Sequence, residues 1–444
     1  MAGAMTTALL LARSLSWPSA SSYDAWAYAA WGQAIARGEQ LVYNVSTTPK
    51  PLASLLAAIV SPLPPTRSWG VVVVLALGVL VGGLLAAGYR DGGTLGAAVA
   101  AVAFVVVAPL DWIMWLSLVD AVTAALVVLG IALRGRARIV SFLLAGLLRP
   151  EAWPACALAG YVELHGSRRR RTLGALALGA FPVILWAAFD FAFAGHPLAT
   201  LDFQQNLGAD ELGRATPQSP LEALDLFRGQ IVESGAVFSL VGGVGLLVHA
   251  WRTGRDRILS FPLAVALVWT AALIAETIYG FELHLRYLLP LTAVLALGWG
   301  LLVGSFVRPG WSRRPGLIWA AVAATLAATS LHVARMEFGR TAQEWERIRL
   351  AAYHSLPTIE PVLECGRLGL VGRRGVGARI ALLAAATRTS LARFERAESS
   401  PANRYAGILA VRGRESWRLP VTWPTRRTPV GPVAVNPECP PHVG

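Results

Sequence analysis

The chain has 444 residues, of which 55% are hydrophobic and only 15% are charged, and its formal net charge is +13. Soluble domains carry about 25% charged residues, so this composition excludes an ordinary water-soluble protein. The positive charge does not indicate a nucleic-acid partner, because all basic residues except Lys50 are arginines, and many of them gather in short loops between apolar runs. These basic loops lie at residues 134–138, 168–171, 252–257 and 308–314.

Apolar runs of close to 20 residues recur along most of the chain. A helix of about 20 residues crosses the ~30 Å hydrocarbon core of a bilayer. The sequence therefore predicts an all-α polytopic membrane domain over residues 1–334, with about 11 transmembrane helices. The fifth and sixth runs are short, and they either cross separately or form one re-entrant pair around Arg149-Pro150-Glu151. The runs lie at 4–19, 69–88, 94–110, 117–133, 139–149, 152–165, 172–194, 230–250, 259–279, 287–306 and 316–334.

The basic loops predict the orientation of the chain, because short basic loops lie on the cytoplasmic side of a membrane. Residues 4–19 are expected to form the first membrane helix rather than a cleaved signal peptide, with the amino terminus inside. The turn GYRDGG at 88–93 is then also inside. The segments expected outside a multi-pass protein of the cell inner or plasma membrane are 20–68, 111–116, 149–151, 195–229 and 280–286.

The first outer loop, residues 20–68, contains two helical segments that are too short to span a bilayer. The segment 24–37 is aromatic and amphipathic, which is typical of a helix lying at the membrane interface. The segment 51–61 is apolar and bounded by prolines, and we expect it to lie in the headgroup region.

The tail, residues 335–444, differs in character from the rest of the chain. A helix is expected over 341–363, and short strands are expected at RLGLVG, SLARFER and YAGILAVRG. We therefore predict a small extracytoplasmic α/β domain. Cys365 and Cys439 both lie in this tail, where a disulfide would suit an oxidising exterior.

Ionisable residues at the edges of membrane segments are costly and point to function. In the expected topology they gather on the outer side, whereas the inner side carries mainly arginine clusters. A transporter is expected to place such residues near the bilayer midplane on broken helices. The outer set comprises Asp24, Lys50, Asp111, Asp120, Arg149, Glu151, His196, Asp202, Glu276, Glu282, His284 and Arg286.

The order of these residues resembles a known superfamily. Tyr23-Asp24-Ala25-Trp26 opens the first outer helix and Lys50-Pro51-Leu52 precedes the second. SLVDA (117–121), LLRPEAW (147–153) and RYLLPL (286–291) follow. This order resembles the GT-C membrane glycosyltransferases, especially the protein O-mannosyltransferase and aminoarabinose-transferase branch.

The resemblance implies transfer of a sugar from a polyprenyl-phosphate carrier to an acceptor on the outer face, which would be a cell-envelope glycan, lipid or protein. It implies that Asp24 acts as general base or supports the acceptor. Transfer from a lipid phosphate requires a carboxylate that takes a hydroxyl proton and cations that hold the phosphate. Lys50, Arg149 and Arg286 are the expected donor-phosphate ligands. No metal or other cofactor is expected. The alternative is that the site binds a divalent cation.

Other residues are assigned to the acceptor side or left as further candidates. Asp120 or Asp111 is the expected second acidic site, with Glu151 beside it, and His196, Glu282 and His284 are additional candidates. Each has a structural alternative: Asp24 as a helix cap, Lys50 as a cation that extends to the interface, and Arg149 with Glu151 as an ion pair that closes a helix break. A flippase or transporter of lipid-linked sugars and a non-catalytic envelope assembly protein remain alternative functions.

Overall fold

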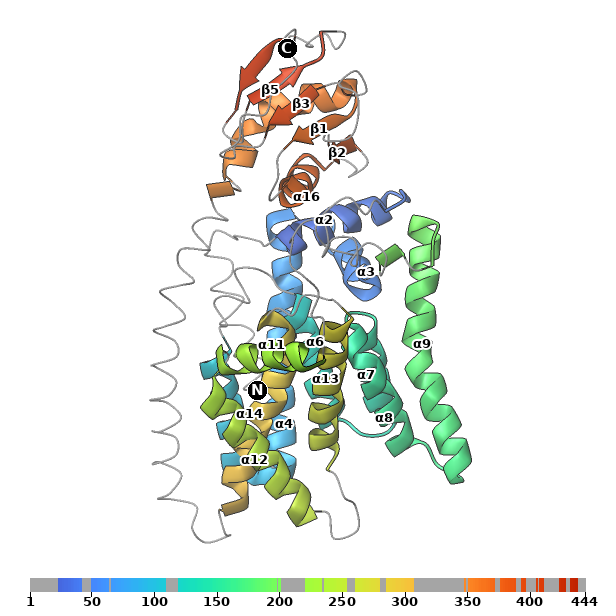
Figure 1. Cartoon of the computed structure of the whole chain (residues 1–444), viewed down its shortest axis with the longest axis vertical. Coiled ribbons are helices and arrows are strands. Elements are labelled where there is room, and N and C mark those ends of the chain that lie inside the picture. Colours follow the sequence, from blue (N-terminus) through green and yellow to red (C-terminus); the bar gives the residue numbers. More distant parts are fainter. Residues whose placement is uncertain are drawn as a thin grey trace.

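The computed structural model describes residues 23–41, 49–63, 65–108, 119–197, 199–200, 220–233, 235–253, 260–279, 285–306, 347–348, 350–371, 376–388, 393–396, 405, 407–410, 423–428 and 432–437. They form a helical body with a small sheet domain at one end (Figure 1). The helices of the body are α2 (Tyr23–Ala36), α3 (Pro51–Ile59), α4 (Pro65–Val107), α6 (Val119–Ala132), α7 (Arg136–Gly146), η1 (Pro150–Ala152), α8 (Trp153–Glu163), α9 (Arg168–Ala194), α11 (Pro220–Glu233), α12 (Ala236–Thr253), α13 (Phe261–Ile278), η2 (Leu285–Leu288) and α14 (Leu289–Phe306).

Five of the described helices are long and apolar enough to cross a membrane: Trp69–Val107, Arg168–Ala194, Ala236–Thr253, Phe261–Ile278 and Arg286–Phe306. The expected runs 4–19 and 316–334 lie outside the described residues. Helix α11 was not expected from the sequence, and it runs roughly across the longer helices (Figure 1). The described residues thus form a helical, multi-pass membrane protein.

The first of these segments, α4, contains two of the expected runs. Its backbone leaves the helical conformation at Gly93, where φ is 69°. In a continuous helix nine residues span about 13.5 Å, yet a Cβ placed on Gly88 would lie 2.8 Å from Cα of Ala97. The chain therefore reverses at Gly93, as the separate runs 69–88 and 94–110 predict.

Helices α7 and α8 pack as an antiparallel hairpin. The Cys156 thiol lies 2.9 Å from the carbonyl oxygen of Phe142, and Glu163 accepts a 2.7 Å hydrogen bond from the Gly135 N–H. Each helix has 11 residues and is about 16 Å long, which is too short to cross a ~30 Å core. These lengths favour the re-entrant pair over two separate crossings.

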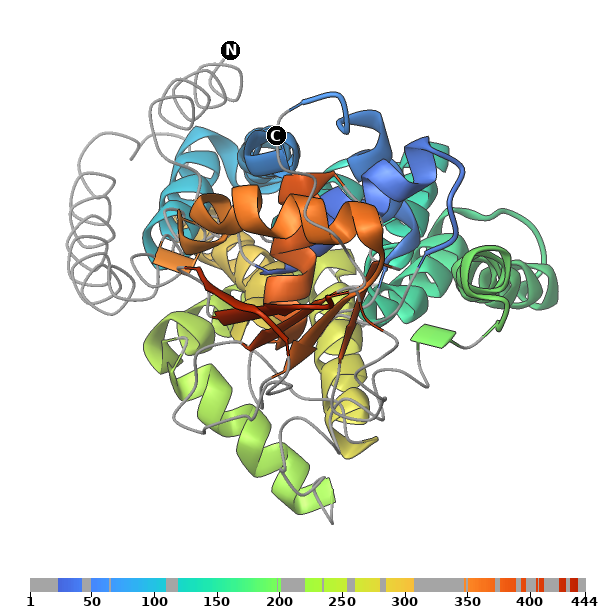
Figure 2. The same ribbon diagram turned by 90° about the horizontal axis from the view of Figure 1, so that it is seen from above.

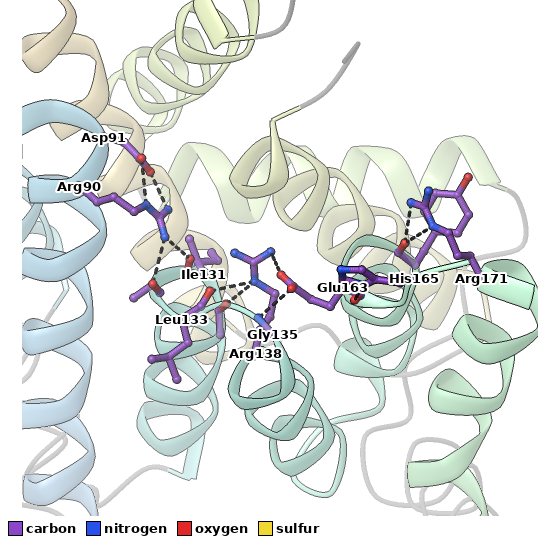
Figure 3. Close-up of polar contacts among 12 residues, drawn as sticks. Arg90, Asp91, Ile131, Leu133, Gly135, Arg138, Glu163, His165 and Arg171 are labelled. Carbon is purple, nitrogen blue, oxygen red and sulfur yellow. Dashed lines mark hydrogen bonds and ion pairs between the residues drawn. The ribbon is translucent and has the colours of Figure 1, made fainter. Parts of the chain in front are cut away.

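One end of the helical body is tied together by two arginines (Figure 3). Arg90 donates to the carbonyls of Ile131 and Ala132, and Arg138 donates to those of Gly130 and Leu133. The last carbonyls of a helix have no intrahelical partners, so these contacts complete the end of α6. The turn at 88–93 therefore lies at the same end as the basic loop 134–138, as the sequence predicts.

Arg138 differs from the sequence expectation, which placed it in a basic loop. It lies inside α7 with only 6% of its surface exposed, and its guanidinium forms an ion pair of 2.6 Å with Glu163. The guanidinium also lies 4.0 Å from the ring centroid of Phe261. The reason for its burial is structural: the side chain joins α6, α8 and α13.

Helix α14 lies centrally in the body, with glycines on two of its faces. A Cβ on Gly300 would collide with the carbonyl oxygen of Gly96 on α4, and a Cβ on Gly298 would collide with that of Gly242 on α12. Small residues let membrane helices approach closely and gain packing contacts. Helix α9, by contrast, stands at the periphery in both views (Figure 1, Figure 2).

The sheet domain lies over the end of the body that carries α2 and α3 (Figure 1, Figure 2). A helix over 350–365 precedes the sheet, and α16 (Val376–Thr387) follows its first strand. The strand order is β2-β1-β3-β5-β4. Strand β1 is parallel to β2 and β3, and β5 is antiparallel to β3 and β4. The strands are β1 (Leu368–Val371), β2 (Phe394–Arg396), β3 (Gly407–Ala410), β4 (Thr425–Arg427) and β5 (Pro432–Val435).

The cysteines of the chain differ in whether they form a disulfide bond. Cys365 is disulfide-bonded, whereas Cys156 is free and buried in α8. Cys439, the expected partner of Cys365 and the third cysteine of the chain, lies outside the described residues.

Helix α2 corrects the expectation of an amphipathic interfacial helix. Residues 25–31 are all at most 4% exposed, because α3, α4 and α16 pack around them. Tyr28 contacts Trp31 and Trp69 with ring-centroid distances of 5.5 and 5.1 Å. The aromatic side chains that suggested a headgroup location are instead used in packing between protein segments.

Candidate functional site

The candidate site is built around the tip of the α7–α8 hairpin. Arg149 lies between α7 and η1 in an extended conformation, with φ −146° and ψ 129°. Pro150 disfavours a helical conformation at the residue before it, so the sequence itself ends α7 here. The break places Arg149 and Glu151 at the hairpin tip, where they are 6% and 1% exposed.

Asp120 is the closest charged partner of Arg149. It lies in the first turn of α6, is 1% exposed, and forms an ion pair with the Nη2 group of Arg149. Nη1 of Arg149 lies 3.9 Å from Oε1 of Glu151. The local Arg149–Glu151 ion pair is therefore present, but the closer ion pair of Arg149 joins the hairpin tip to a different helix.

The ring of Tyr287 lies close to two arginines. The guanidinium carbon of Arg149 lies 3.9 Å from the centroid of its ring, and that of Arg286 lies 5.3 Å from it. A cation over an aromatic ring is attracted by the negative face of the ring. Helix η2, which carries both Arg286 and Tyr287, thus brings a second cation to the hairpin tip.

Lys50 reaches the same region from the segment between α2 and α3. It is the N-cap residue of α3, followed by Pro51 in the first turn, and the neighbouring N–H of Leu52 donates to the carbonyl of Leu147 at 3.3 Å. Lys50 is only 5% exposed, so it does not extend into solvent as the alternative of an interfacial cation requires. It interacts electrostatically with Glu276 on α13.

Glu276 belongs to this group, although it was not selected as a site residue from the sequence. Its helix α13 packs on η1, which carries Glu151, and its carboxyl group interacts electrostatically with Glu151, Arg149 and Lys50. In the sequence it is an acidic residue near the end of an apolar run, one of the polar residues expected on the outer side.

Several polar atoms at the hairpin tip have no hydrogen-bond partner in the part of the chain that the structure describes. They are Oδ2 of Asp120, Nε of Arg149 and Oε2 of Glu151. A buried donor or acceptor without a partner is costly, and one such donor together with two such acceptors indicates a place where an additional polar group can bind. The guanidinium of Arg149 can still donate from Nε, which suits an oxyanion.

The structure describes the remaining candidates only in part. Asp24 is the second residue of α2, but its side chain lies outside what the structure describes, as do Asp111, Glu282 and His284 entirely. His196 lies in the exposed turn after α9. The residues brought together are Lys50, Asp120, Arg149, Glu151, Glu276, Arg286 and Tyr287.

Within the described residues, no group of three or more His, Cys, Asp or Glu side chains is placed to hold a metal ion. The carboxylates of the site lie instead beside basic side chains. This arrangement matches an anion-binding site more closely than a divalent-cation site, which takes several carboxylate and carbonyl oxygens.

No protein-family model and no curated protein matches the chain. Among solved structures, it is similar to ArnT from Cupriavidus metallidurans in the apo state, with a TM-score of 0.49 and 13% identity over 98% of each chain. The same protein bound to undecaprenyl phosphate gives a TM-score of 0.42 and 14% identity, covering 92% of this chain and 86% of that one.

The chain is also similar to the Archaeoglobus fulgidus oligosaccharyltransferase tethered with an acceptor peptide. The TM-score is 0.44 and the identity 13%, covering 91% of this chain and 64% of that one. At these identities the similarity concerns the course of the chain and not its chemistry.

Proposed function

We propose that the protein is a membrane glycosyltransferase of GT-C type, which moves a sugar from a polyprenyl-phosphate carrier to an acceptor at the outer face. The observation that carries this proposal is the convergence of Lys50, Arg149 and Arg286. They come from three separate segments of the chain and gather where Arg149 keeps a buried, unpartnered Nε donor.

The cations suit the phosphate of such a donor. Arginine binds phosphate with a planar, bidentate fork, whereas lysine binds it as a compact point charge. The ion pair with Asp120 and the ring of Tyr287 fix the orientation of Arg149, so little side-chain freedom is lost when a ligand binds. In this proposal Arg149 is the central phosphate ligand, and Lys50 and Arg286 act beside it.

The acceptor side of the reaction is assigned to Asp24, with Asp120 or Asp111 as the second acidic residue. Transfer requires that the acceptor hydroxyl loses its proton as its oxygen bonds to the sugar and the sugar–phosphate bond breaks. A carboxylate in reach of that hydroxyl is a suitable general base. Asp24 lies on α2, which packs against α3, the helix that Lys50 caps.

We further propose that the site faces the extracytoplasmic side, together with the sheet domain. The basic loops 134–138 and 168–171 lie at the other end of the α7–α8 hairpin, next to Arg90 and Glu163 (Figure 3). Because such loops are retained in the cytoplasm, the hairpin tip with Arg149 would point outward. The sheet domain, which packs on α2, would then cover the acceptor side.

The test is sugar transfer from labelled polyprenyl-phosphate donors in vesicles that contain the purified protein. Wild type should transfer sugar and Asp24→Asn should not. Asp225→Asn is a matched control, because Asp225 is a solvent-exposed acid on α11. Equal transfer by wild type and Asp24→Asn would remove the role of Asp24, and no transfer by any variant would favour a non-enzymatic assembly protein.

The short hairpin supports a second candidate, a transporter or flippase of lipid-linked sugars. A break between two helices of about 16 Å places Arg149 and Glu151 within the depth of the helical body, and transporters use broken helices at such depth. Movement of a labelled lipid-linked sugar between leaflets, without transfer to an acceptor, would favour this candidate.

A further inference from the structure

Helix α9 carries a buried acidic residue near its C-terminal end. The helix stands at the periphery of the body (Figure 1, Figure 2), and its buried residues are Ala175, Pro182, Trp186, Phe189 and Asp190. Asp190 is only 2% exposed. A buried carboxylate is costly unless it is hydrogen-bonded, and an acidic residue within a membrane segment points to a function.

The chain folds back at the end of α9 and brings Thr200 to this carboxylate. Gly195 ends the helix in the left-handed conformation, with φ 74°, which glycine adopts without strain. The backbone N–H of Thr200 donates to Oδ2 of Asp190 at 2.9 Å, and its hydroxyl donates to Oδ1 at 2.8 Å. Thr200 is itself only 5% exposed. The carboxylate thus fixes the turn after α9 against the helix.

Trp186 extends this contact toward the α7–α8 hairpin. It lies one turn before Asp190 on the same face of α9, and its indole Nε1 donates to Oγ1 of Thr200 at 3.4 Å. The ring of Trp186 meets the ring of Trp153 edge to face, with 5.8 Å between the ring centroids. Aromatic pairs favour this geometry. Trp153 is the first residue of α8, so the contact joins α9 to the hairpin.

Trp153 joins the two ends of the hairpin tip. Its Nε1 donates to the carbonyl of Gly146, the last residue of α7, at 2.9 Å. This bond spans residues 147–152, which include Arg149. Pro182 of α9 packs at the same place, because a Cβ on Gly146 would lie 2.9 Å from Cβ of Pro182 and 3.2 Å from Cδ1 of Trp153. Helix α9 therefore contacts the hairpin at the two residues that hold the tip.

We propose that Asp190, Thr200 and Trp186 are positioning residues of the phosphate site, which hold α9 against Trp153 and so fix the hairpin tip that carries Arg149. The effect on phosphate binding rests on the proposed function, whereas the link between α9 and the tip does not. The buried Nε donor of Arg149 must point at a phosphate oxygen, because hydrogen bonds weaken steeply away from their best geometry. A shift of the tip should therefore reduce affinity for the phosphate group and not for the lipid chain.

The first test measures the preference of the full-length protein for polyprenyl phosphate over the matching polyprenol, which lacks the phosphate. Thr200→Val keeps the shape of the side chain but removes its hydroxyl group. Trp186→Leu removes the ring that contacts Trp153 but leaves Asp190 with both donors of Thr200. Each variant should lower the preference about 3- to 10-fold. Thr200→Ser keeps both donors and should match the wild type.

Ser141→Ala is the matched control, because it also removes a buried hydroxyl group that donates a hydrogen bond. Ser141 is 3% exposed, and its Oγ donates to the carbonyl of Leu126 at 2.7 Å, which joins α7 to α6. This variant should lower stability but leave the lipid preference unchanged. An unchanged preference in both Thr200→Val and Trp186→Leu overturns the proposal. An equal loss in Ser141→Ala also overturns it, because the loss would then report stability alone.

The second test needs no substrate and compares the melting temperatures of the wild type, Thr200→Val, Trp153→Phe and the double variant. Trp153→Phe removes the Nε1 donor to Gly146. The double variant should lose less than the sum of the two single losses, because the contacts depend on one another. Additive losses overturn the link between α9 and the tip. If the losses are coupled but the wild type does not prefer polyprenyl phosphate, the link stands, and the proposed function fails together with the positioning role.

Discussion

Asp120 and Arg149 form a buried ion pair that joins the first turn of α6 to the tip of the α7–α8 hairpin, across a sequence separation of 29 residues. Both side chains are almost inaccessible to solvent, at 1% and 7%. Removing one partner of such a pair leaves an uncompensated buried charge, whereas removing both can be nearly neutral. Single and double substitutions of Asp120 and Arg149 should therefore differ in their effect on stability.

Asp120→Ala should destabilise the protein by roughly 3–5 kcal/mol, because Arg149 then stays buried without its partner. The Asp120→Ala/Arg149→Met double variant should recover most of this loss. The measurement is the unfolding midpoint of each variant in mixed detergent micelles. A single variant as stable as the wild type would mean that the two charges do not depend on each other.

Tyr287→Leu should weaken the binding of polyprenyl phosphate by about 3- to 30-fold, because the ring that orients Arg149 and Arg286 is lost. Tyr287→Phe keeps the ring and should stay close to the wild type. Titration of both variants with the phosphate lipid compares them directly. Equal losses in the two variants would show that the hydroxyl group and not the ring is the important feature.

Gly32→Ala should disturb the packing of α2 on α3. A Cβ on Gly32 would lie 2.6 Å from the carbonyl oxygen of Ala57, and backbone cannot yield as a flexible side chain can. We expect lower stability and lower sugar transfer, since these helices carry Asp24 and Lys50. Gly243→Ala is the control, because a Cβ there meets nothing within 4 Å, and it should be neutral or stabilising by up to about 1 kcal/mol.

Arg138→Ala should lower stability without a specific effect on transfer. The change removes two hydrogen bonds to the end of α6 and the ion pair with Glu163 (Figure 3), at the end of the hairpin away from Arg149. A loss of a few kcal/mol is expected, with transfer per folded molecule unchanged. Arg134→Ala, at an exposed position of the same basic loop, should match the wild type in both assays.

The membrane class and several turns could be predicted from the sequence because they depend on local composition. Apolar run length gives the spanning helices, and Pro150 gives the hairpin break. The reversal at 88–93 follows from the two runs on either side of it. These features need only the preferences of residues close together in the chain.

The partners within the site could not be predicted in the same way. The sequence offers Glu151 as a local ion-pair partner for Arg149, but the closer partner of Arg149 is Asp120 on another helix. Glu276 could not be distinguished from other polar residues at the ends of apolar runs, because its meaning depends on its packing against η1. The aromatic residues of α2 suit either a membrane interface or a protein core, and only the packing of α3, α4 and α16 around them decides between the two.

The central claim is that Lys50, Arg149 and Arg286 bind the phosphate of a lipid carrier. The most direct test compares the binding of polyprenyl phosphate and of the matching polyprenol, which lacks the phosphate, to the wild type and to Lys50→Gln. We predict that the wild type binds the phosphate lipid much more tightly than the alcohol, and that Lys50→Gln loses most of this preference. Equal binding of the two lipids by the wild type, or an unchanged preference in Lys50→Gln, would contradict the account.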